Sequence, residues 1–252
     1  MKATTEKEIQ TLREGGKMLA EILYAVVKKA VPGASTAFLN TEAERLIRAH
    51  GAKPSFLGYT VRGAPAPYPA ALCTSVNDEV VHAIPSEKRI LKDGDIIGLD
   101  LGLWWNGLCV DAAVTVGVGD ISAKAQKLID VARQALQEGI AAVKRGAPTG
   151  DVGHAVQTYV EKNGFSVVRD LAGHGVGRAV HEEPIVLNFG KKGTGELLEE
   201  GMVIAIEPMV NEGDWHVKAD TDGWTIRTAD GKLSAHFEHT VLVTREVCKV
   251  LT

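Results

Sequence analysis

Apolar side chains recur at the spacing of an amphipathic helix in four stretches of this chain, two in each half. The expected helices cover residues 5–30, 36–49, 122–144 and 151–162. Turns that contain proline and glycine separate the two helices of each pair. Gly15 and Gly16 predict an interruption in the first helix, because glycine costs about 1 kcal/mol in a helix interior.

Strand-forming runs follow each helix pair. Residues 96–104 and 108–116 flank an Asn-Gly dipeptide, the strongest short signal for a two-residue hairpin turn. Pairing across that turn sets residue 102 opposite residue 111. Asp100 and Asp111 then project from the same face as diagonal neighbours on adjacent strands. A solvated acid near a hairpin end is the alternative interpretation for either residue alone.

The second half repeats the sequence of the first. LKDGDIIGLD at 91–100 returns as LEEGMVIAIE at 198–207, and VDAAVTV at 110–116 returns as FEHTVLV at 237–243. The repeat therefore aligns Asp100 with Glu207, and Asp111 with Glu238. We predict an α/β fold in one catalytic domain, residues 1–252, with two pseudosymmetric halves, about 1–120 and 121–252. A shared site is expected where the halves meet.

Four acids in apolar strands require compensation of their charge. At short range their repulsion would force protons onto them unless cations intervene. Two divalent metal ions are the simplest answer. The alternative for Glu238 is an ion pair with a cation such as Arg227. Pro208 follows Glu207 and lacks a ladder donor, so the strand is expected to be irregular there.

Four histidines accompany these acids. His174 lies in AGHGVGR, and its glycine neighbours allow close approach of the backbone, so it is either a nitrogen ligand or an incidental residue of a flexible loop. His82 and His181 each precede a proline, one in each half. Such a pair suits hydrogen bonding to a substrate beside a metal centre. His236 shares the strand face of Glu238 and is a candidate to support it.

The composition narrows the class of protein. An apolar fraction of 45%, a charged fraction of 24% and a net charge of −4 are ordinary for a globular protein and give no sign of nucleic-acid binding. Three cysteines without CxxC spacing fit a reducing cytoplasm. No apolar stretch approaches the length of a membrane span. We expect a cytoplasmic protein.

The motifs in this order resemble type I methionine aminopeptidases of bacterial kind, over about residues 6–250. They read SVNDEVVHAIP, DGDIIGLDLG, GHGVGRAVHEEP, IEPM and DGWTIRTADGKLSAHFEHT. The resemblance implies the "pita-bread" fold, two similar halves around a dinuclear metal site. It also implies five metal ligands: Asp100, Asp111, His174, Glu207 and Glu238. Asp111 and Glu238 would bridge the two ions.

The resemblance also implies a reaction. A hydroxide between two ions (Co, Mn, Fe or Zn) would attack the first peptide bond and release methionine that precedes a small residue. Glu207 would move the proton, and His82 and His181 would contact the substrate. The residues expected to line the methionine pocket are Tyr68, Cys73 and Trp224. Asn77 and Ser234 fall where the family often binds a monovalent cation. The expected substrates are nascent polypeptide N-termini, also at the ribosome, and the expected state is a monomer.

Two departures from the family pattern concern the pocket. The segment 61–73 is longer and richer in proline than the usual loop, and Val180 replaces an aromatic residue. Two other functions stay open: an Xaa-Pro aminopeptidase of the same fold, and a non-catalytic binding homologue. The first would require a different pocket, and the second would usually have lost a metal ligand.

Overall fold

The computed structural model describes residues 1–61, 63–64 and 66–252. Its helices are α1 (Glu6–Val27), α2 (Thr36–Ala49), α3 (Ala123–Ala142) and α4 (Thr149–Lys162). The strands of the first half are β1 (Lys53–Pro54), β2 (Leu72–Val76), β3 (Glu79–Val81), β4 (Ile96–Trp105) and β5 (Leu108–Gly117). Those of the second half are β6 (Ser166–Val167), β7 (Ala172–Gly175), β8 (Glu182–Leu187), β9 (Val203–Ile206), β10 (Met209–Asn211), β11 (Val217–Ala219), β12 (Ile226–Thr228), β13 (Ser234–His236), β14 (Glu238–Val243) and β15 (Cys248–Val250).

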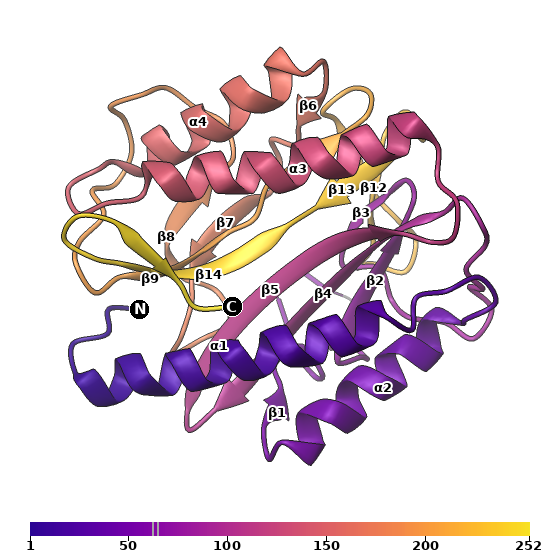
Figure 1. Ribbon diagram of the computed structural model, residues 1–252, viewed down its shortest axis with the longest axis horizontal. Helices are drawn as coiled ribbons and strands as arrows, with labels where there is room; N and C mark the ends of the chain where they lie inside the picture. The colour runs from indigo at the N-terminus through magenta and orange to yellow at the C-terminus, as the bar shows by residue number, and fades with distance from the viewer. Residues whose placement is uncertain (62, 65) are drawn as a thin grey trace.

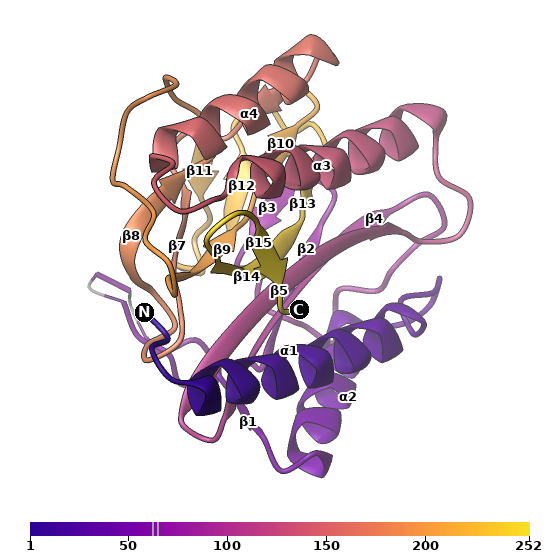
Figure 2. The same ribbon diagram turned by 60° about the vertical axis from the view of Figure 1, so that its left-hand side comes forward.

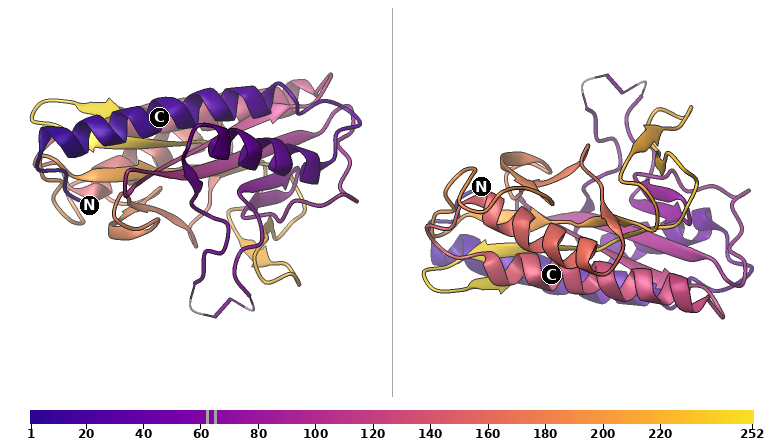
Figure 3. Two further views of the ribbon diagram at one scale, coloured as in Figure 1. Left: turned by 90° about the horizontal axis from the view of Figure 1, so that it is seen from below. Right: turned by 90° about the horizontal axis from the view of Figure 1, so that it is seen from above.

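One antiparallel sheet runs through both halves. Its strand order is β1-β4-β5-β14-β9-β7-β8, with β2 added beside β4 and β15 beside β14. The halves meet where β5 pairs with β14, so that Glu238 lies opposite Ala113. The four helices cover one face of this sheet, α1 and α2 over the first half and α3 and α4 over the second (Figures 1 and 2). The connection between β1 and β2 and the segment with β11 and β12 project from the other face (Figure 3).

The two halves use the same hydrogen bonds at equivalent places. The Gly33 N–H donates to the Leu91 carbonyl at 2.8 Å, and the Gly146 N–H donates to the Leu198 carbonyl at 2.7 Å. Both glycines have positive φ, +90° and +81°, a conformation that costs glycine little. The predicted α/β fold with two related halves is confirmed.

The hairpin of β4 and β5 has the predicted register. Gly102 pairs with Asp111, and Asp100 pairs with Ala113. The turn residues Asn106 and Gly107 both have positive φ, as a type I′ turn requires. The acids therefore share one face of the hairpin, and the intervening leucines fill the other face.

The core lies between the helices and the sheet. In the first half, leucines of α1 and of the hairpin are fully buried together, among them Leu12, Leu19, Leu101 and Leu103. In the second half, Leu128 and Leu136 of α3 pack with Ile206 and Val241 of the sheet. Each such side chain contributes about 1.5–3 kcal/mol by leaving water. This packing fixes the strands whose opposite face carries the acids.

The predicted interruption of the first helix is wrong. α1 is continuous through Gly15 and Gly16, and a capping box of Thr5 and Glu8 closes its start. Its end at Val27 comes three residues before the predicted one. Both glycines are buried because the helix packs closely there: a Cβ built on Gly16 would lie 2.1 Å from the Leu251 carbonyl oxygen.

We expect the substitution Gly16→Ala to destabilise the protein by about 1–3 kcal/mol, because the new methyl group would displace backbone rather than a flexible side chain. Gly15→Ala is the matched control, since its Cβ would lie 3.3 Å from the Cβ of Trp105. There the helical propensity of alanine offsets the tight contact. Urea denaturation of the two variants makes the measurement, and equal stability would contradict the packing explanation.

Candidate metal centre

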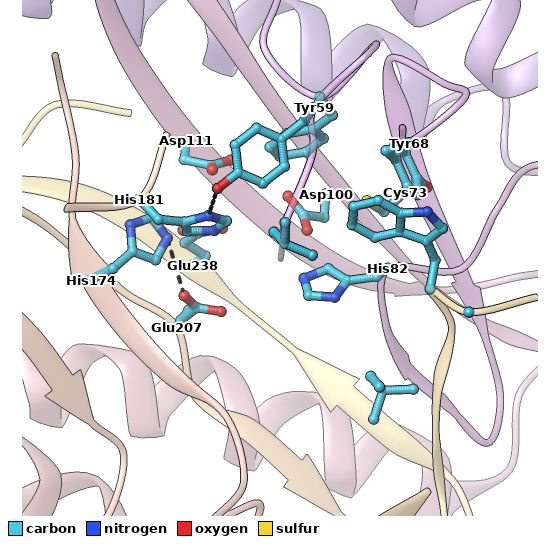
Figure 4. Close-up of a pocket in the computed structure, with 15 residues that line it drawn as sticks. Tyr59, Tyr68, Cys73, His82, Asp100, Asp111, His174, His181, Glu207 and Glu238 are labelled. Carbon is cyan, nitrogen blue, oxygen red and sulfur yellow. Dashed lines mark hydrogen bonds and ion pairs between the residues drawn. The ribbon is translucent and has the colours of Figure 1, made fainter. Parts of the chain in front are cut away.

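The five predicted ligands converge on one cavity on the sheet face that the helices leave open (Figure 4). They come from five separate segments of the chain, four of them strands and the fifth the bend after β9. In chain order they are Asp100 on β4, Asp111 on β5, His174 on β7, Glu207 after β9 and Glu238 on β14. The bend at Glu207 and Pro208 interrupts pairing, as the proline predicted, and β10 begins only at Met209.

The ligand atoms lie close enough to share an ion. Donor atoms of Asp111, His174 and Glu238 all lie within 4.8 Å of one another. The His174 Nε2 is 3.3 Å from a Glu207 carboxylate oxygen. The other ring nitrogen, Nδ1, lies 2.8 Å from the Gly175 carbonyl and donates to it, which leaves Nε2 free to bind a cation. The structure therefore favours the ligand interpretation of His174 over an incidental loop residue.

No lysine or arginine among the described residues forms an ion pair with these buried acids. Burial raises the pKa of Asp111 to about 7, with repulsion from Glu207 adding to it, and burial raises the pKa of Glu207 to about 8. Burial and neighbouring acids hold the pKa values of Asp100 and Glu238 well above their usual range. In the metal-free protein these carboxyl groups retain protons that an exposed acid would have lost.

Two buried oxygens in the cluster have no hydrogen-bond partner within the described residues, Asp100 Oδ1 and Glu238 Oε1. An unpaired buried acceptor costs about 1–3 kcal/mol, so such atoms call for an explanation. Oxygen donors that face one another with a single imidazole suit a divalent cation. The residues present therefore fit a metal centre.

The alternative ion pair for Glu238 is not formed. The Arg227 guanidinium binds Asp78 and Glu79, at 3.0 and 2.7 Å, and also contacts Asp220. These contacts tie β12 to the turn before β3, away from the acid cluster. Arg227 is therefore not the ion-pair partner of Glu238.

The cavity beside the acids has a volume of about 210 Å³. That exceeds the roughly 150 Å³ of a buried cavity that accepts benzene, so one amino-acid side chain fits. All three predicted pocket residues line it, Tyr68, Cys73 and Trp224. The sequence analysis missed four further lining residues, Phe56, Tyr59, Gly223 and Ile226.

Both predicted substrate histidines also line this cavity. His82 adopts a positive φ of 60°, a rare conformation for a non-glycine residue that is often found at functional sites. Burial and the neighbouring His181 together lower the pKa of His82 to about 4. Burial also lowers the pKa of His181. Both rings are neutral near pH 7 and can each offer one donor and one acceptor.

The sequence suggested His236 as support for Glu238, but in the structure the histidine lies beside Glu207. Its Nε2 is 3.5 Å from the second carboxylate oxygen of Glu207, and burial lowers the pKa of His236 to about 3. Asn188 also supports this bend, since its side-chain amide donates to the Glu207 carbonyl at 3.0 Å. No sequence signal pointed to Asn188, because it acts through one contact 19 residues away.

Asn77 and Ser234 are brought together by the fold. The Ser234 N–H donates to the Asn77 carbonyl at 2.8 Å, and Asn77 has a positive φ of 61°. The monovalent cation expected beside these residues stays a prediction.

The segment 61–73 is described except for Arg62 and Pro65, and the prediction for those two residues lies outside the described residues. Val61 lines the cavity, and the Trp224 indole N–H donates to the Ala66 carbonyl at 3.0 Å. This segment therefore forms a wall of the cavity that contacts the second half. Val180, the other departure, is buried in the first-half core.

None of the helices in the described part of the chain combines the length and apolar character needed to cross a membrane.

Comparison with known proteins gives consistent results. The sequence pattern of Metallopeptidase family M24 matches residues 10–245. A methionine aminopeptidase of Clostridium perfringens is 49% identical, over 98% of this chain and 96% of that protein. The crystal structure of a Thermotoga maritima methionine aminopeptidase superposes with a TM-score of 0.95 at 43% identity, over 100% of this chain and 99% of that one. A Pyrococcus furiosus prolidase shares the fold, with a TM-score of 0.76 at 22% identity, over 99% of this chain and 65% of that one.

Proposed function

This chain belongs to metallopeptidase family M24, and we propose that it is a hydrolase that removes the N-terminal methionine of peptides and nascent proteins with a small second residue. One observation carries the proposal: five metal-binding side chains and an apolar cavity for one side chain occupy the same site. The use of a divalent metal follows from the family.

We propose that the five ligands hold two divalent ions, of Co, Mn, Fe or Zn. Asp111 and Glu238 would hold them from adjacent strands where the two halves meet, together with Asp100, His174 and Glu207. When bound, such ions would lower the pKa of a water molecule and polarise the scissile carbonyl group. The four carboxylates would balance the charge of two dications.

The protein side chains would handle the protons and the substrate. Glu207, deprotonated when a cation is bound, would accept a proton from the attacking water and return it to the leaving amine. His181 would donate a hydrogen bond to the carbonyl oxygen as negative charge develops there, and His82 would bond to the substrate amide.

The pocket would bind methionine by shape and polarisability. Tyr68, Cys73 and Trp224 would surround the side chain, and the Cys73 sulfur offers a soft contact to a thioether. Burial raises the pKa of the Cys73 thiol well above its usual range, so it stays a neutral apolar surface rather than a nucleophile. The limited volume would admit one residue and no more.

We further propose that the protein acts in the cytoplasm as a monomer, on chain ends that include those emerging from ribosomes. The mixed charge and the net value of −4 support a peptide substrate rather than a nucleic acid.

The other two functions are less well supported. The likeness to a prolidase at 22% identity concerns the fold alone. A non-catalytic homologue has no need of five converging ligands, yet all five converge here.

Release of free amino acid from Met-Ala-Ser and from an Ala-Pro peptide tests the proposal, with metal-stripped protein titrated with Mn(II) or Co(II). We expect metal-dependent release of methionine from Met-Ala-Ser, saturating at two ions per chain, and little cleavage of the proline peptide. Met-Lys-Ser is the control for the second residue. Cleavage of the proline peptide alone would replace the proposal by the Xaa-Pro activity. Metal binding without any cleavage would indicate a changed substrate pocket, and the absence of both cleavage and metal binding would favour the binding homologue.

A further inference from the structure

Tyr59 connects the two halves at the mouth of the cavity. Its hydroxyl lies 2.6 Å from Nδ1 of His181, a residue 122 positions away, and the two rings meet edge to face at 5.2 Å (Figure 4). The His181 ring also meets the His174 ring edge to face, at 4.3 Å. Its orientation is therefore set by one neighbour through a hydrogen bond and by another through packing.

The backbone holds Tyr59 in place. The Tyr68 N–H donates to the Tyr59 carbonyl, and the Gly58 N–H donates to the Tyr68 carbonyl, both at 2.8 Å. The Tyr59 N–H donates to the Phe56 carbonyl at the same distance. These hydrogen bonds join the backbone at Tyr59 to the backbone at Tyr68, near the two ends of the connection between β1 and β2. Because the Tyr59 backbone is constrained in this way, its hydroxyl can fix the position of the His181 ring.

Tyr68 makes a contact next to the other substrate histidine, His82. Tyr68 is only 2% exposed, and its hydroxyl donates to the carbonyl of Ala83, next to His82, at 3.0 Å. Two tyrosines that are joined by backbone hydrogen bonds therefore contact both histidine segments, Tyr59 at His181 and Tyr68 beside His82. Of the two, Tyr59 contacts the imidazole ring of a predicted substrate-binding residue directly.

A neutral imidazole has one nitrogen that donates and one that accepts. If the Tyr59 hydroxyl donates to Nδ1, the proton of His181 must reside on Nε2. Nε2–H is then a donor available in the cavity, which is what a carbonyl oxygen requires. The other tautomer would present an acceptor, and an oxygen that gains negative charge could not bond to it.

We propose that Tyr59 is a positioning residue that holds His181 in the tautomer with its proton on Nε2. The catalytic part of this proposal rests on the proposed function. Tyr59 itself would touch the methionine side chain only through its ring, and its hydroxyl would act through His181.

The test is Tyr59→Phe, which keeps the ring and removes the hydroxyl. With Met-Ala-Ser we expect kcat to fall about tenfold while KM changes less than about twofold, because the lost contact acts in the transition state. Tyr24→Phe is the matched control, since Tyr24 is 63% exposed on α1. In the His181→Ala background, Tyr59→Phe should have no further effect, as expected for residues that act as one unit.

A second measurement does not need turnover. The ¹⁵N spectrum of histidine-labelled, Zn(II)-loaded protein should show His181, identified by its absence in His181→Ala, with a protonated Nε2 and an accepting Nδ1. In Tyr59→Phe the signals should shift toward a mixture of tautomers. An unchanged ¹⁵N pattern, or additive losses of kcat in the double variant, would overturn the proposal. If the wild-type protein does not cleave methionine peptides, the proposed function fails while the spectrum still decides the pairing of Tyr59 with His181.

Discussion

Asp111→Asn is expected to abolish methionine release, lowering kcat by about 10³-fold or more and metal affinity by over about 100-fold. Loss of a residue that only orients a ligand already costs 10–100-fold in affinity, so loss of a shared ligand should cost more. The fold should survive, because the Ala112 N–H that now donates to Asp111 at 3.0 Å can donate to the asparagine carbonyl instead.

The metal-free stability of this variant separates a metal site from a structural acid. Removing one of four mutually repelling acids should leave the metal-free protein as stable as the wild type or more stable. Asp170→Asn, at an exposed acid outside the cavity, is the matched control and should change neither activity nor metal uptake. Full activity or normal metal uptake in Asp111→Asn would refute the metal centre.

The second large effect is a loss of stability with rising pH in the metal-free protein. Asp111 and Glu207 have folded pKa values of about 7 and about 8, well above the value near 4 of an unfolded acid. From pH 7 to 8.5 the folded state therefore holds protons that the unfolded state has released. Stability falls as pH rises wherever the folded state binds more protons. We expect a decrease of roughly 1–3 kcal/mol across this interval.

The buried histidines act in the opposite direction at lower pH. Burial lowers the pKa of His82 to about 4 and the pKa values of His174 and His236 to about 3. Between about pH 4 and 6.5 the unfolded state binds these protons, so stability from this source rises with pH. Above pH 7 these histidines are neutral in both states, so they do not offset the decrease from the acids.

Urea denaturation with a chelator at pH 7.0, 7.75 and 8.5 measures this decrease, and the same series with Zn(II) is the comparison. Bound cations keep the carboxylates deprotonated, so the loaded protein should not lose stability over this interval. Asp111→Asn should show a smaller decrease. A rise in metal-free stability from pH 7 to 8.5 would show that the acids do not carry raised pKa values.

The ligand cluster was predictable because its signals are local and repeated. The Asn-Gly turn fixes the register of Asp100 and Asp111, and the repeat extends the argument to Glu207 and Glu238. The spacing of residues on two strands joined by a short turn depends only on nearby sequence, and the structure has the register that this spacing predicts. The pairing of β5 with β14 then follows from the symmetry of the halves.

The unpredicted features depend on partners far away in the chain. Gly16 favours a break by its own propensity, but packing against Leu251 overrides that preference. The sequence around Tyr59 contains no functional motif, because the role of this residue depends on a hydrogen bond to the distant His181. The lining by Phe56 and Ile226 likewise appears only when the two halves face each other.

The pairing of β5 with β14 means that the acid cluster is complete only after the two halves have come together. Asp100 and Asp111 fold within one hairpin, whereas Glu238 joins them only when a strand 125 positions from Ala113 docks beside it. Such distant pairings form slowly, and this one brings acidic side chains close together. A dication bound by acids from both halves would therefore stabilise the contact between the halves against the repulsion between these acids.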